Sequence, residues 1–136
     1  MNSDNKNTVS LSVAKGWTAA WRTKCPDNCK AFLIPAVDLV QVLNEIGVLG
    51  DKAAAKAQAK AKAKAKDVRA YVAIGSEAGG PVEEKLLLVG TNKDDKGIYR
   101  DIIDGKSLGA NNGPNSGIYD FTSPCPTACD PDSPLN

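Results

Sequence analysis

The residues most capable of chemistry in this sequence are four cysteines arranged in two matching motifs. Cys25 and Cys29 bound one copy of Cys-Pro-x-x-Cys, and Cys125 and Cys129 bound a second copy almost a full domain later. The proline presets a turn, so the two sulfur atoms within each motif are expected to lie near each other. Cα atoms four positions apart in a turn or helix are separated by about 6 Å, which a disulfide can bridge.

Several kinds of cysteine chemistry are compatible with this spacing. Each motif can close its own disulfide, or the two motifs can be cross-linked, and either bond would imply export or release from the cell. The thiols can instead stay reduced as small buried hydrophobic side chains. All four sulfur atoms can also hold one zinc ion, although such sites mostly leave two residues between paired cysteines. Thiol-redox catalysis fits least, because the gap here is three residues.

A second group of candidate residues is a run of alternating lysine and alanine. Residues 51–67 hold six lysines and two aspartates, a local charge of +4, so the rest of the chain carries −3 of the net +1. This run can bind phosphate backbones by releasing counterions, or the acidic remainder of another copy. It has no aromatic residue for stacking and no arginine for base readout, so such binding would be non-specific. The candidate anion-binding residues are Lys52, Lys56, Lys60, Lys62, Lys64 and Lys66.

Catalytic chemistry has little support elsewhere in the sequence. The chain has no histidine, which removes the commonest general base, the Ser-His and Cys-His pairs, and histidine-containing metal sites. Residues 92–103 begin like a calcium loop, but the fifth and twelfth positions, Lys96 and Ile103, cannot serve as its ligands. We therefore predict no catalytic residue, cofactor, metal ion or small-molecule substrate, and do not expect an enzyme.

Two helices are predicted before the lysine-rich run. Thr8 or Ser10 can cap the first helix. It should end by Lys24, because the next residue precedes a proline and is biased away from helical geometry. The apolar run 31–34 is either a strand or the lead into a second helix. Pro35 suits the first turn of that helix, and apolar residues then follow a three-and-four spacing.

The lysine-rich run itself is predicted to be a helical arm, since alanine and lysine are both good helix formers. Period-two alternation on a helix spreads the charges over the whole surface. We therefore expect no apolar stripe that could dock this helix on the protein's own core.

The second half of the chain reads as strands. Alternating or continuous apolar residues predict strands at 68–74, 85–91, 98–103 and 118–122. The expected fold is one α+β domain over residues 1–136, with two N-terminal helices packed on a three- to four-stranded, mainly antiparallel sheet. Its other parts are the Lys/Ala-rich helical arm at 51–67, a Gly/Asn-rich loop at 106–117 and an irregular, extended C-terminal tail at 123–136.

The layout resembles a family of small bacterial proteins of unknown activity. The residues that carry the resemblance are Leu11, Ala14, Trp17, Thr18, Arg22, 31–35, 68–71, 87–90, Tyr119, Asp120, Phe121, Pro124, Cys125, Pro126 and Cys129. They span most of the chain, and the cysteine-containing ending is the specific part. The Lys/Ala run looks like an insertion relative to that layout. The resemblance transfers no catalytic residue.

These observations leave three hypotheses for function. The first is a structural, self-assembling protein, a homo-oligomer or polymer that forms a filament, tube or layer; it rests on the missing catalytic groups and the segregated charge. The second is a binding module for non-specific nucleic acid or another anion, acting through Lys52 to Lys66. The third is a thiol-redox or disulfide-stabilised exported protein.

Location is predicted from what the sequence contains. No stretch approaches the roughly 18–20 apolar residues that span a bilayer, and the polar N-terminus does not look like a signal peptide. A cytoplasmic protein is therefore the default expectation. An extracellular or released protein is expected instead if the cysteines are disulfide-bonded.

Overall fold

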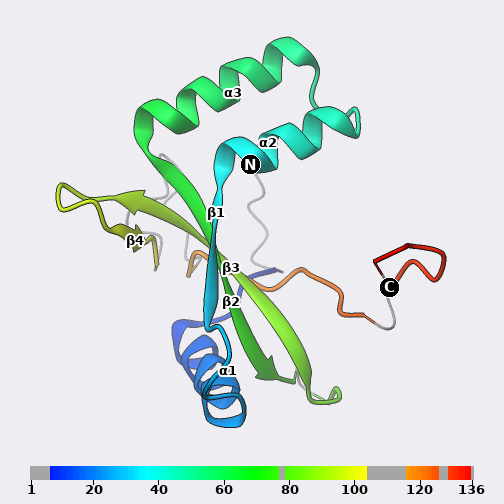
Figure 1. Ribbon diagram of the computed structural model, residues 1–136. Coiled ribbons are helices and arrows are strands. Elements are labelled where there is room, and N and C mark those ends of the chain that lie inside the picture. Colours follow the sequence, from blue (N-terminus) through cyan, green and yellow to red (C-terminus); the bar gives the residue numbers. More distant parts are fainter. Residues whose placement is uncertain (1–6, 77–78, 104–115, 126–128, 136) are drawn as a thin grey trace.

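The fold is α+β, as predicted. The computed structural model describes residues 7–76, 79–103, 116–125 and 129–135 (Figure 1). Its elements in chain order are α1 (Leu11–Lys24), β1 (Ala31–Pro35), α2 (Ala36–Glu45), α3 (Asp51–Lys64), β2 (Lys66–Gly75), β3 (Glu83–Lys93), β4 (Tyr99–Asp101) and β5 (Ile118–Tyr119). Most of the predicted loop at 106–117 lies outside the described residues. The described parts of the predicted C-terminal tail contain neither helix nor strand.

The strands form one antiparallel sheet in the order β1-β2-β3-β4, and β5 also pairs with β3. Its centre is the long pairing of β2 with β3, in which Tyr71 lies opposite Leu87. Cross-strand partners point to the same side of a sheet. One side, which we call the inner face, therefore carries Tyr71, Leu87, Val89 and Ile118. The opposite side is the outer face.

Helix α1 covers the inner face and forms the core with it. Ser10 caps the helix by accepting a hydrogen bond from the Val13 backbone N–H. Ala14 is buried against Ala73, and Trp17 packs beside them. The helix ends where predicted, with the Cys25 N–H donating to the Trp21 carbonyl, because the proline that follows prevents another turn. The core is small, since much of its apolar material is alanine.

Trp17 fixes how closely α1 approaches the sheet. Its indole lies over Gly75, where an added Cβ would come within 2.3 Å of the ring. Nearby, the Lys85 ammonium lies 3.0 Å from the Asp120 carboxylate and 5.1 Å from the centre of the Trp17 ring. The side chains of Lys85 and Asp120 are each 5 % exposed. A buried charge is tolerated when it is paired and hydrogen-bonded, so this pair ties the chain after β5 to the sheet.

Helices α2 and α3 form a hairpin at the end of the sheet where β1 ends and β2 begins (Figure 1). The Lys/Ala helix has a docking stripe that was not expected, although this stripe packs on α2 and not on the core under α1. Ala54 is buried, and the Gln58 side-chain amide donates to the Val37 carbonyl of α2 at 3.1 Å. Residues 54, 57, 58, 61 and 65 are its buried or half-buried positions. Their three-and-four spacing forms a narrow stripe, and small alanine side chains allow the two backbones to approach closely.

The exit from this hairpin is determined by one backbone conformation and one hydrogen bond. Ala65 takes the left-handed conformation with φ 47°, which ends α3 and turns the chain into β2. The Asp67 carboxylate then accepts a hydrogen bond from the Ala36 N–H at the start of α2. A negative charge is favourable at a helix N-terminus. The second helix thus begins at Ala36, with Pro35 as the residue before its first turn.

We predict opposite effects for two glycine substitutions. Gly75→Ala should lower the free energy of unfolding by about 1–3 kcal/mol, because its methyl group would displace the Trp17 indole. Gly16→Ala should raise it by about 0.5–1 kcal/mol, because Gly16 lies inside α1 with open space around it. Urea denaturation followed by circular dichroism measures both values. Equal stability of the two variants would contradict the placement of Trp17.

Candidate functional site

The most unusual surface of the hairpin is an apolar stripe on α2. Leu39, Val42, Leu43 and Ile46 follow helical spacing, and their exposed fractions range from 37 % to 65 %. The opposite side of the helix, which includes Val37 and its neighbours toward α3, is half-buried. A helix normally directs such a stripe at its own core. Here α3 takes the other side of the helix, so the stripe is left exposed.

The predicted lysines divide between two elements. Lys52, Lys56, Lys60, Lys62 and Lys64 are exposed on α3. Lys66 does not belong to the helical arm, because the chain has already turned into β2, where Lys66 is half-buried opposite Asn92. Helix α3 therefore presents five cations in the same hairpin as the apolar stripe. We refer to these two features together as the hairpin surface.

The outer face of the sheet is the second notable surface. Its apolar members are Phe32, Ile34, Val68, Ala70, Val72, Ile74, Leu86, Leu88 and Tyr119. Phe32 is 54 % exposed, Ala70 is buried and the others are half-buried. Glu84, opposite Ile74, adds an exposed carboxylate to the same face. Among the described helices, α1 packs along the inner face, and the α2–α3 hairpin meets the sheet only at its end (Figure 1).

This second apolar face was not recognised from the sequence, although a signal for it exists. A strand with one buried face alternates apolar and polar residues, whereas residues 86–89 are an unbroken apolar run. Such a run indicates apolar side chains on both faces of the sheet. The strand predicted at 85–91 is confirmed as β3, which lies between β2 and β4 and carries apolar side chains on both faces.

The free edge of β1 offers little backbone for pairing with another chain. The Val72 N–H donates to the Lys30 carbonyl. Hydrogen-bonded pairs alternate along an antiparallel ladder, so Ala31, Leu33 and Pro35 turn their backbone groups outward. The Cys29 thiol donates to the Ala31 carbonyl at 3.0 Å, and Pro35 has no N–H. Blocked edges of this kind oppose strand addition, so side chains are the better means of contact.

The four predicted cysteines do not share one state. Cys125 and Cys129 form a disulfide, with Cα atoms 5.0 Å apart. Of the alternatives for the first motif, the structure has the reduced one: Cys25 and Cys29 are free thiols. Hydrogen bonds hold that turn instead: the Trp21 indole donates to the Cys29 carbonyl at 3.0 Å, and the Cys29 thiol points to Ala31.

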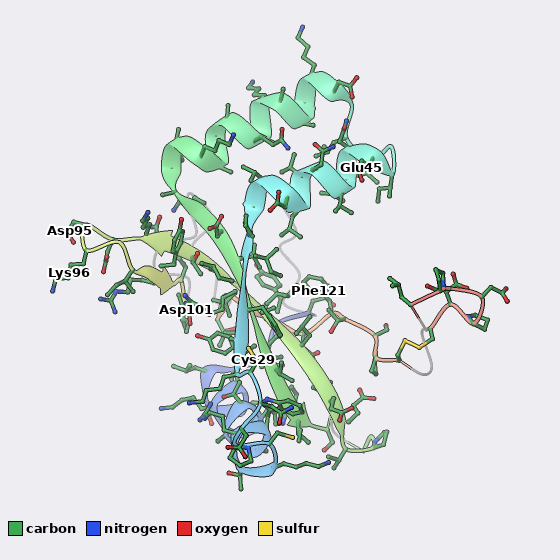
Figure 2. All side chains as sticks on the ribbon, viewed as in Figure 1. Cys29, Glu45, Asp95, Lys96, Asp101 and Phe121 are labelled. Carbon is green, nitrogen blue, oxygen red and sulfur yellow. A yellow bond between two sulfur atoms is a disulfide. The ribbon has the colours of Figure 1, made fainter. Side chains whose placement is uncertain are left out.

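The two cysteine motifs also do not meet. Figure 2 shows the disulfide in the C-terminal segment, away from Cys29 before β1. In the part of the chain that the structure describes, no three or more acidic or cysteine side chains gather as a metal site would require. A single zinc ion held by all four sulfur atoms, one of the alternatives drawn from the spacing, is therefore not formed.

No family model, curated protein or solved structure matches this chain. The resemblance to the small bacterial proteins described above therefore stays a prediction. No helix within the described residues has the length and apolar character needed to cross a membrane. Because no relative indicates a function, the functional proposal is based on the hairpin surface and the outer face.

We predict that mass spectrometry will separate the two cysteine motifs. Alkylation of the folded, non-reduced protein should label Cys29 first, because its thiol is exposed, and should leave Cys125 and Cys129 unlabelled until a reductant is added. Alkylation of all four thiols before reduction would contradict the disulfide. A mass loss of two further hydrogens, mapped to Cys25 and Cys29, would contradict the free thiols.

Proposed function

We propose that this chain is a structural, self-assembling protein, and that the hairpin surface of one copy docks on the outer face of the next. The observation that carries the proposal is the exposed stripe of Leu39, Val42, Leu43 and Ile46 on a helix whose other side is already packed. Isolated exposed apolar residues are ordinary, whereas a contiguous apolar stripe on one element marks a contact site.

Charge complementarity supports the choice of partner surface. The lysine-rich segment carries +4, and the rest of the chain carries −3. The outer face combines half-buried apolar side chains with the exposed carboxylate of Glu84 at one end, and the same register places Lys66 at its opposite end. The hairpin surface combines apolar side chains with lysines. Apolar side chains on both surfaces, together with attraction between Glu84 and the lysines of the next copy, favour docking at the Glu84 end of the face.

The proposed contact is head-to-tail, because it joins two different surfaces of the same molecule. Contacts of this kind form rings when the rotation closes and open helical filaments when it does not. Full burial of one aliphatic side chain stabilises by about 1.5–3 kcal/mol, and association costs at least about 4 kcal/mol in lost freedom. A few such side chains therefore make a weak single contact, which repetition in a filament, tube or layer reinforces.

The test is electron microscopy of negatively stained protein together with analytical ultracentrifugation. The unmodified chain should assemble as its concentration rises, and Val42→Glu with Ile46→Glu should keep it monomeric, because two carboxylates would be placed in the apolar contact. Val13→Glu with Leu135→Glu is the matched control, since Val13 on α1 and Leu135 near the C-terminus are exposed apolar residues outside both surfaces. Monodisperse particles of the unmodified chain at high concentration would contradict the proposal.

A second candidate function is non-specific binding of nucleic acid or another polyanion. It is favoured by the five exposed lysines of α3, of which Lys52, Lys56, Lys60 and Lys64 repeat every four residues and so lie near one another. Binding through these lysines would weaken steeply with salt, because it is driven by counterion release. Without arginine or aromatic residues on the helix, it would not discriminate sequence.

We predict that replacing Lys56, Lys60, Lys62 and Lys64 by Gln abolishes any DNA or RNA binding. The fold should be retained, because these side chains are exposed and glutamine is a good helix former. The control variant replaces the same number of exposed lysines outside the helix, namely Lys24, Lys30, Lys93 and Lys96.

Fluorescence anisotropy of a labelled oligonucleotide at several salt concentrations measures both variants. Equal loss of binding in both would mean that general positive charge, and not α3, binds the nucleic acid. Unchanged binding in the α3 variant would remove the helix from consideration.

A further inference from the structure

A cavity of about 390 Å³ lies between α1 and the inner face of the sheet. It exists because α1 presents large and small side chains toward the sheet. Trp17 packs against the core cluster. Ala14, Thr18 and Ala19, which line the cavity, are too short to fill the space beside it. The Thr18 hydroxyl donates to the Ala14 carbonyl at 2.9 Å, so it is already satisfied within the helix.

The rest of the cavity wall is mainly apolar and comes from distant parts of the chain. Leu87 and Val89 of β3 and Ile118 of β5 form its floor, and Leu11 and Ile103 also line it. Leu87 and Val89 are among the most buried side chains of the molecule. The site is therefore part of the core packing, and its walls are held by the central strands. Ligand sites are typically concave, mostly apolar and preformed in this way.

One end of the cavity carries a hydrogen-bonded polar group. Asp101, at the end of β4 (Figure 2), accepts hydrogen bonds from the Arg69 guanidinium and the Tyr71 hydroxyl. Arg69 also donates to the Tyr99 carbonyl at 3.0 Å. Burial and the bond to Asp101 raise the pKa of Tyr71, so this side chain keeps its proton and the bond up to strongly alkaline pH. Arg69 offsets the negative charge of Asp101.

The two cations that line the cavity come from α1. Lys15 and Arg22 lie two turns apart on the helix face that lines the cavity, and both are exposed. Within the described residues, no carboxylate forms an ion pair with either side chain. Because Asp101 is matched by Arg69, these two cations give the cavity a net positive charge. A ligand with an apolar body and a negative head group complements both features.

We propose that this cavity binds a small apolar carboxylic acid, a molecule with a hydrophobic body and one carboxylate. The body lies against Leu87, Val89 and Ile118, and the carboxylate lies toward Lys15 and Arg22 on α1. The proposal concerns the inner face and is independent of assembly through the hairpin surface and the outer face.

The first test compares probes that share a ten-carbon apolar chain, decanoate and decanol, by isothermal titration calorimetry. Decanoate should bind saturably and more tightly than decanol. Lys15→Gln and Arg22→Gln should each weaken decanoate about threefold to fivefold, as expected for an exposed ion pair, and should leave decanol unchanged. Lys24→Gln is the matched control, because Lys24 is exposed on α1 outside the cavity. Equal affinities for the two probes, or no saturable binding of decanoate, would overturn the proposal.

The second test locates the ligand without any substitution. Leu87 lies on the inner face and lines the cavity, whereas its neighbours Leu86 and Leu88 lie on the outer face. Methyl resonances of Leu87, Val89 and Ile118 should therefore shift when decanoate is added to isotope-labelled protein, and those of Leu86 and Leu88 should not. Shifts confined to Leu86 and Leu88 would mean that decanoate coats the outer face, and would overturn the proposal.

A cavity-filling variant gives an independent check. Ala19→Phe should lower the affinity for both decanoate and decanol at least tenfold, because the ring would occupy the space of the ligand. Circular dichroism verifies that the variant is folded. Unchanged affinity in a folded Ala19→Phe protein would overturn the proposal, and the methyl shifts of the unmodified chain decide the matter if this variant does not fold.

Discussion

The pairing of β2 with β3 is the constraint on which the other features of this molecule depend. The ladder runs from Lys66 opposite Asn92 to Gly75 opposite Glu83. Because successive side chains alternate between faces, this register sends Tyr71 and Leu87 inward and Val72 and Leu86 outward. A slip of one residue would exchange the two sets. The core under α1, the cavity beside it and the apolar outer face all follow from this one alignment.

Polar contacts on the inner face reinforce the alignment at both ends. Arg69 and Tyr71 of β2 hold Asp101 at the end of β4, and Lys85 of β3 holds Asp120 just after β5. Each contact joins the central ladder to a short strand that has few hydrogen bonds of its own. The Lys85–Asp120 pair is buried, and a buried charge is costly when its partner is missing, so this pair favours a single register over its alternatives.

The inner face, the outer face and the hairpin surface differ in the chemical character of their side chains. The inner face is covered by α1 and leaves a positively charged, apolar cavity. The outer face is apolar with an exposed carboxylate, and the hairpin surface combines apolar side chains with lysines. The last two complement each other, which is the basis for proposing a head-to-tail assembly. A ligand in the cavity would contact α1, which lies at the opposite end of the sheet from the hairpin (Figure 1).

Features that depend on neighbours in the chain could be predicted from the sequence. Helix α1 starts at the cap Ser10 and ends before a proline, and the strands follow their apolar patterns. Each of these is determined within a few residues. The fold class followed from the order of such elements.

Features that depend on contacts between distant residues were decided only by the tertiary structure. An apolar stripe looks the same whether it faces a core or solvent, so nothing in α2 revealed that Val42 and Ile46 are exposed. The docking of α3 depends on a bond from Gln58 to another helix, and the cavity depends on how closely Trp17 and Gly75 bring α1 to the sheet. The two cysteine motifs have the same spacing, yet only the second closes a disulfide; in the first, Cys29 is hydrogen-bonded to Trp21 and Ala31, which lie outside the motif.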